Sequence, residues 1–63
     1  MFSMAELGSG VGGAVRALRR RRGTTLRELA ADVGVSPGTM SAIENGKVAV
    51  TVERLQQLAT ALH

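Results

Sequence analysis

The stretch from Leu26 to Gly46, LRELAADVGVSPGTMSAIENG, constrains the fold more than any other part of this sequence. Its apolar residues recur with the spacing of two short helices, at about 26–33 and 36–45, and Gly34 lies in the turn between them. Two helices joined by a short turn that contains glycine form a helix-turn-helix unit. The residues that we expect to face the core shared by the two helices are Leu29, Ala30, Val33, Val35, Met40 and Ile43.

Capping residues mark where these two helices begin and end. Thr25 is a suitable N-cap for the first helix, and Glu28 three residues later completes a capping box. Ser36 and Pro37 are an equally strong start for the second helix, because a capping hydroxyl precedes a proline at the first helical position. Gly46 closes this helix, since glycine readily adopts the left-handed conformation at a helix end.

Two further helices are predicted on either side of this unit. Residues 14–22 carry a narrow apolar stripe surrounded by arginines, and residues 52–62 repeat the helical apolar spacing after a capping Thr51. Short connections join all four predicted helices. The sequence therefore predicts a compact all-α domain, a four-helix bundle that contains the helix-turn-helix.

The beginning of the chain is rich in glycine. Residues 1–13 contain glycines at positions 8, 10, 12 and 13. Glycine is costly inside a helix because it loses more backbone freedom on folding than any other residue. We therefore expect a flexible leader over residues 1–13 and one folded domain, which contains the helix-turn-helix, over residues 14–63.

The composition argues against catalysis. The chain has no cysteine, which excludes disulfides and thiolate chemistry, and its single histidine, His63, argues against a nitrogen-rich metal site. The sequence also lacks a serine, histidine and aspartate set and a glycine-rich phosphate loop between a strand and a helix. We therefore expect no enzyme activity, no metal and no cofactor.

Charge and aromatic content indicate the kind of partner. No apolar run approaches the roughly 18 residues that cross a membrane, and the start of the chain lacks the features of a secretory signal, so we expect a cytoplasmic protein. The net charge of +3 favours an anionic partner. Phe2 is the only aromatic residue, which leaves no platform for stacking single-stranded bases. If the anionic partner is a nucleic acid, we therefore expect double-stranded DNA.

With these features, the stretch from Val15 to Leu62 resembles the repressor domains of the phage lambda repressor and Cro type. The resemblance lies in LRELA at 26–30, GVS at 34–36, IENGK at 43–47 and LQQLATAL at 55–62. It implies a transcription regulator, a repressor in the first instance, whose third helix enters the major groove of DNA. The family usually has five helices and acts as a homodimer, so this sequence corresponds to the five-helix fold without its last helix.

The resemblance also implies a structural ion pair. In the family, the arginine that matches Arg19 pairs with the glutamate that matches Glu44. We therefore expect these two side chains to join the first and third helices, half-buried or buried. Other regulators of this kind carry a C-terminal sensor domain in a longer protein, and such a domain is a further expectation here.

The third helix supplies the residues expected to face the bases. Positions that often carry glutamine or arginine in the family are Pro37, Gly38 and Ala42 here, and none of these can make the two-pronged hydrogen bonds that read guanine or adenine. Hydroxyl contacts, methyl contacts and DNA shape must then give selectivity. The residues of this helix that we expect at the DNA are Ser36, Pro37, Gly38, Thr39, Ser41 and Ala42.

Other residues are expected to face phosphates. By resemblance, the segment after the third helix meets the DNA backbone through main-chain amides, Asn45 and the charge of Lys47. The run of arginines at the end of the first helix adds Arg20 and Arg21, and Arg27 adds a further charge. Each of these also has a plain structural interpretation as a helix cap or a solvated basic face.

A second class of function stays open at this point. The chain is either the DNA-binding domain of a regulator or a protein-interaction module, such as an antitoxin, in which DNA binding is secondary. An antitoxin normally carries an additional segment that wraps its toxin, and residues 1–13 are the only candidate for one here.

Overall fold

The computed structural model describes residues 4–63, with side chains described from residue 10 onward. Within this range it contains four helices and no strand, which confirms the all-α prediction. The helices are α1 (Met4–Arg21), α2 (Leu26–Val33), α3 (Pro37–Glu44) and α4 (Val52–Ala61). The bounds of the last three agree with the sequence prediction to within a residue at each end.

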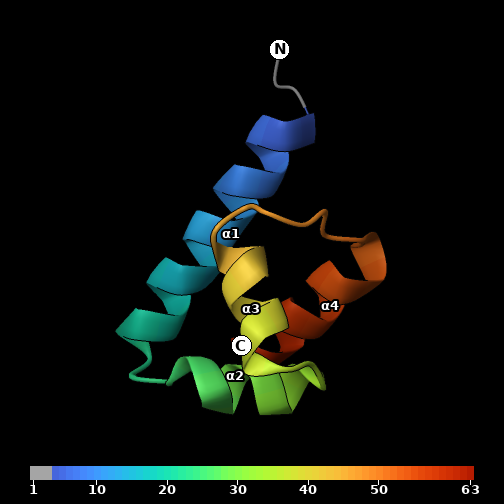
Figure 1. The fold of residues 1–63 in the computed structure, drawn as a ribbon. Helices are drawn as coiled ribbons and strands as arrows, with labels where there is room; N and C mark the ends of the chain where they lie inside the picture. The colour runs from blue at the N-terminus through green and yellow to red at the C-terminus, as the bar shows by residue number, and fades with distance from the viewer. Residues whose placement is uncertain (1–3) are drawn as a thin grey trace.

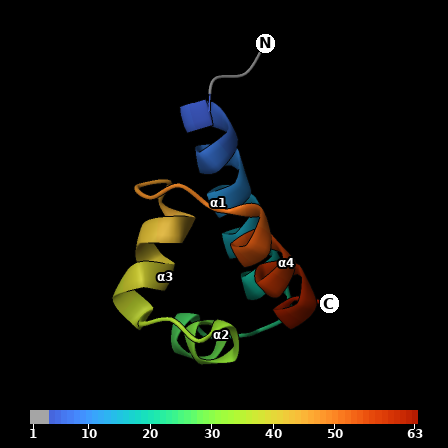
Figure 2. The same ribbon diagram turned by 90° about the vertical axis from the view of Figure 1, so that its right-hand side faces the viewer.

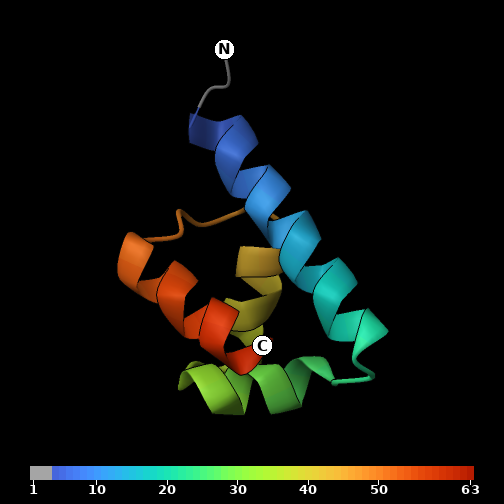
Figure 3. The same cartoon turned by 180° about the vertical axis from the view of Figure 1, so that it is seen from behind.

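Helix α2 lies across one end of the other three helices (Figure 1). The chain turns from α2 directly into α3, and the connection from α3 to α4 lies at the ends of these two helices away from α2, beside the middle of α1 (Figures 1 and 3). Helix α3 packs against α1 and α2, while α4 packs mainly against α2. One side of α3 is therefore supported by the rest of the domain, and the other side is turned away from it (Figure 2).

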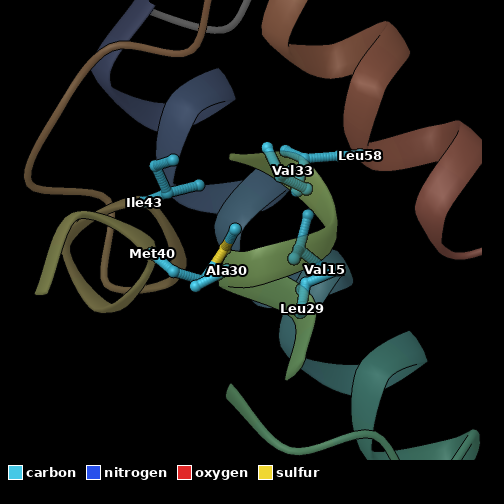
Figure 4. Close-up of a cluster of buried hydrophobic side chains, with 7 residues drawn as sticks. All are labelled: Val15, Leu29, Ala30, Val33, Met40, Ile43 and Leu58. Atoms are coloured by element: carbon cyan, nitrogen blue, oxygen red, sulfur yellow. The ribbon is translucent and has the colours of Figure 1, made fainter. Parts of the chain in front are cut away.

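Seven apolar side chains, contributed by all four helices, form the core (Figure 4). They are Val15, Leu29, Ala30, Val33, Met40, Ile43 and Leu58. Leu29 and Met40 are 0% exposed, so the two helices of the helix-turn-helix bury their facing residues completely. Burying a side chain of this size contributes about 1.5–3 kcal/mol each relative to leaving it in water.

The predicted caps are formed. The hydroxyl of Thr25 accepts the backbone N–H of Glu28, and the Glu28 carboxylate accepts the backbone N–H of Thr25, which is the complete capping box. Ser36 and Thr51 cap α3 and α4 in the same way, through hydroxyls that accept the N–H three residues later. Gly34, at the end of α2, has φ of 83°, the left-handed conformation that the turn requires.

The start of the first helix differs from the prediction. Helix α1 begins at Met4, not near Ala14, so residues 4–13 belong to a helix instead of a flexible leader, and only residues 1–3 lie outside the described residues. Val11 packs against the core and Gly12 is buried. The intrinsic cost of glycine is thus overridden where the helix packs on the domain, a contact that a sequence-based propensity does not include.

An apolar groove remains between α1 and α4. It has a volume of about 330 Å³ and is lined by Val11, Ala14, Val15, Leu18, Leu55, Leu58, Ala59 and Leu62. Leu18 and Leu55 are 45% and 43% exposed there, although both are large apolar side chains. Within residues 4–63, no helix has the length and apolar character needed to cross a membrane.

Candidate nucleic-acid interface

Helix α3 is attached to α1 by the expected ion pair. Arg19 donates from Nε to Oε2 of Glu44 at 2.8 Å and from Nη2 to Oε1 at 3.0 Å, a two-pronged contact. The Arg19 Nη1 also donates to the carbonyl of Thr24 at 3.1 Å. The hydrogen bond with Glu44 raises the pKa of Arg19, against the opposing effect of burial. Since the Glu44 side chain is only 1% exposed, this pair fixes the end of α3 to α1 with a buried charge.

A second arginine joins the same cluster, which the sequence reasoning did not predict. Arg16 lies 3.4 Å from the Glu44 carboxylate, between Nε and Oε1, and its Nη2 donates to Oδ1 of Asn45 at 2.6 Å. The Asn45 amide in turn donates to the carbonyl of Ser41 at 2.8 Å. The signal was present in the sequence, because Arg16 and Arg19 are three residues apart and therefore share one face of a helix.

The first turn of α3 is exposed and firmly capped. The Ser36 hydroxyl accepts the N–H of Thr39 at 3.1 Å and contacts the Thr39 hydroxyl at 3.0 Å. Pro37 is the first helical residue, and Gly38 is surrounded by open space, because a Cβ built there would meet only Ser36 Oγ, at 3.9 Å. This turn therefore presents a slim, exposed surface with two hydroxyls, held in one conformation by its own hydrogen bonds.

The second turn of α3 is less accessible than the first. Ser41 and Ala42 are half-buried, and the Ser41 hydroxyl lies 3.3 Å from the Asn45 side-chain amide. Asn45 is likewise engaged by Arg16 and by the carbonyl of Ser41. Among the residues expected to read bases, those from Ser36 to Thr39 are the most exposed, so this is the part of the helix with the freest access to a partner.

The structure corrects one expectation for the segment after α3. The amides of Asn45, Gly46 and Lys47 donate to carbonyls within the same turn: to Ser41 at 3.0 Å, to Ile43 at 3.1 Å and to Ala42 at 2.9 Å. These bonds, with Gly46 at φ of 70°, form the Schellman arrangement that closes helices. The amides are therefore engaged and not free for phosphate, which leaves the exposed charge of Lys47 as the contact that this segment offers.

The remaining basic side chains divide into two groups. Arg22 donates to the carbonyl of Leu62 at 2.9 Å and contacts that of His63, and Arg54 donates to Gln57 at 2.8 Å, so both are engaged within the fold. The side chains of the other four basic residues in this set form no hydrogen bond or ion pair within residues 10–63. These four exposed cations are Arg20, Arg21, Arg27 and Lys47.

The exposed cations and the first turn of α3 have a simple spatial relation. Arg20 and Arg21 end α1 and Arg27 begins α2, whereas Ser36 follows the other end of α2 (Figure 1). Helix α2 has eight residues and is therefore about 12 Å long, whereas Lys47 follows the far end of α3.

Comparison with known proteins supports the helix-turn-helix fold. No curated protein matches the sequence. Two solved structures of the clp gene regulator ClgR from Corynebacterium glutamicum are 43% identical over 89% of this chain, with TM-scores of 0.87 and 0.86. The chain covers 73% of one and 60% of the other. Residues 15–63 match the helix-turn-helix family, and the chain therefore belongs to the helix-turn-helix family.

Proposed function

We propose that this chain is a sequence-specific double-stranded DNA-binding domain of a transcriptional regulator, with α3 in the major groove. The observation that carries the proposal is the combination of an exposed, capped first turn of α3 with four exposed cations that have no hydrogen-bonding or ion-pair partner for their side chains within residues 10–63. Membership of the helix-turn-helix family supports it, and both ClgR relatives are described as gene regulators. Such a regulator acts on DNA in the cytoplasm.

Phosphate contacts supply most of the affinity in this proposal. Arg20, Arg21, Arg27 and Lys47 neutralise phosphates on either side of the groove and fix the register of the domain on the duplex. They carry no sequence information themselves. Arg16, Arg19 and Glu44 do not reach the DNA in this account, because they join α1 to α3.

Base contacts in this proposal come from the first turn of α3. The hydroxyl of Thr39 contacts a base edge, Pro37 contacts a thymine methyl group, and Gly38 lets the helix end approach the duplex closely. Ser36 remains a cap that touches phosphate, while Ser41, Ala42 and Asn45 make peripheral contacts. None of these side chains makes a two-pronged contact with a purine, so DNA shape has a larger share of the selectivity than usual.

The experiment begins with selection of bound duplexes from a random DNA pool. The parent chain and two variants, Gly38→Gln and Arg21→Ala, are then titrated against the selected duplex and a scrambled one. Gly38→Gln changes the preference between the two duplexes, by adding a base contact or by blocking docking. Arg21→Ala weakens both alike. If Gly38→Gln leaves both affinities unchanged while Arg21→Ala changes the preference, α3 does not read the sequence.

The proposal extends to assembly. Helix-turn-helix proteins commonly bind as dimers to two half-sites about one helical turn apart. We propose that this domain binds such a site as a homodimer and that it belongs to a longer protein with a C-terminal sensor domain. The mass of the protein–DNA complex, measured by light scattering on the selected duplex, distinguishes one bound chain from two.

A further inference from the structure

Gly12 lies where the backbone of α1 passes close to the end of α3. A Cβ built on Gly12 would lie 2.3 Å from the carbonyl oxygen of Ile43 and 2.7 Å from that of Glu44. Both atoms are backbone, so neither can swing aside as the end of a side chain would. Two such atoms need more than 3 Å, so any side chain at position 12 must separate α1 from α3 by about 1 Å.

The neighbouring glycines show that this constraint is local. Gly10 and Gly13 lie in the same helix, and a Cβ built on either meets nothing within 4 Å. Replacing glycine by alanine at these exposed helical positions is expected to stabilise the helix, because alanine loses less backbone freedom on folding. Position 12 therefore differs from its neighbours in its packing and not in its secondary structure.

Gly12 is the far end of a stripe of α1 residues that contact α3. Arg16, one turn further along α1, contacts Glu44 and Asn45, and Arg19, another turn along, contacts Glu44. The two arginines hold the end of α3 by charge, and Gly12 sets how closely the helix backbones approach. The same α1 ends in Arg20 and Arg21, so the distance between α1 and α3 also sets the distance between phosphate-binding cations and the reading helix.

We propose that Gly12 is a positioning residue for DNA recognition, an inference that rests on the proposed function. By letting α1 lie against the last turn of α3, it fixes the register between the α1 cations, which contact phosphates, and the first turn of α3, which contacts bases. A side chain at position 12 tilts α3 relative to α1. Specific binding then suffers, because phosphate and base contacts are no longer made together, while non-specific phosphate binding continues.

The first experiment compares heat stability among three single variants. Gly10→Ala and Gly13→Ala, the matched controls, raise Tm by about 2–8 °C each, and Gly12→Ala lowers it. A Tm for Gly12→Ala that rises like the controls overturns the close approach. This comparison needs no DNA and therefore tests the packing of Gly12 independently of the proposed function. The proposed function fails instead if the parent chain binds no duplex.

The second experiment places Gly12→Ala in a stabilised background that already carries Gly10→Ala and Gly13→Ala, so that the chain stays folded. Affinity is measured for the selected duplex and for a scrambled one. The selected duplex loses about fivefold or more, the equivalent of one base contact, while the scrambled duplex is unchanged. Equal losses for both duplexes, or a chain that does not fold in this background, overturn the positioning role, because either result assigns Gly12 to stability alone.

Discussion

The buried carboxylate of Glu44 gives the sharpest stability prediction. The change Glu44→Gln keeps the size of the side chain and removes its charge, which leaves Arg19 and Arg16 facing each other across a neutral group. The Arg19 side chain is 12% exposed and that of Glu44 1%, so water screens this pair poorly. Removing one partner of a buried pair costs about 3–5 kcal/mol, and we expect the lower end because the glutamine still accepts one hydrogen bond.

This cost is large relative to the stability of so small a domain. At 0.05–0.15 kcal/mol per residue, a chain of 63 residues has a free energy of unfolding of roughly 3–9 kcal/mol. A loss of about 3 kcal/mol therefore removes between a third and all of it. We expect Glu44→Gln to unfold at a clearly lower urea concentration than the parent chain, and to be largely unfolded at 25 °C if the parent stability lies near about 3 kcal/mol.

The assay is urea unfolding followed by circular dichroism, with two comparison variants. Arg16→Gln removes the outer arginine, whose side chain is 37% exposed and 3.4 Å from Glu44, and should cost about 0–1 kcal/mol. The double change Arg19→Met with Glu44→Leu replaces the pair by apolar side chains and should recover most of the loss. The reasoning is refuted if Glu44→Gln costs no more than Arg16→Gln, or if the double change is as unstable as Glu44→Gln alone.

Three further predictions concern the caps and the core. The hydrogen bonds with Thr25 lower the pKa of Glu28 below its ordinary 4.5. The charged Glu28 therefore stabilises the fold at and above pH 4.5, and this contribution is lost as pH falls through the lowered pKa. The free energy of unfolding, measured as a function of pH, should decrease over this range, and Glu28→Gln should reduce that decrease. Ser36→Ala should cost about 1 kcal/mol in urea unfolding through loss of the α3 cap, and no change would contradict the cap. Leu58→Ala, at a side chain that is 1% exposed, should cost about 2–5 kcal/mol, whereas Leu55→Ala in the open groove should cost much less; equal losses would place Leu55 in the core.

Local signals predicted most of the fold. Helices α2, α3 and α4 begin after Thr25, Ser36 and Thr51, each of which caps its helix as expected. Caps depend on the hydrogen-bonding capacity of one residue and on its near neighbours, so they can be recognised in a single sequence. The glycines in the turn and after α3 are informative for the same reason, because their backbone conformation is local.

Features that depend on distant residues were harder to predict. The glycine-rich start was expected to be flexible, because the cost of glycine is local while the contact of Gly12 with α3 depends on the tertiary fold. Val11 and Val15 are four residues apart, so their spacing, which places one apolar stripe across residues 11–15, was the available clue. The exposure of Leu18 and Leu55 was missed for a related reason, since spacing identifies a helix face but not whether another element covers it.

In the candidate site, too, some features could be predicted from the sequence and others required the three-dimensional structure. Recognition of the family led to Arg19 and Glu44 and to the exposed face of α3. Spacing alone could not show that Arg22 is engaged at the end of α4, or that the amides after α3 are used by the helix cap. Both facts depend on the three-dimensional arrangement, and both reduce the set of groups that remain for phosphate.

The salt dependence of duplex binding tests the central claim most directly, because it counts the phosphates that the domain neutralises. If Arg20, Arg21, Arg27 and Lys47 each neutralise one phosphate, the plot of log affinity against log salt concentration has a slope of about −3.6 for one chain and about −7 for a dimer. Arg20→Ala should reduce this slope by about 0.9 per chain, while Arg22→Ala, at a residue engaged within the fold, should leave it unchanged. A slope near zero for the parent chain would contradict the account, as would an equal change of slope in the two variants.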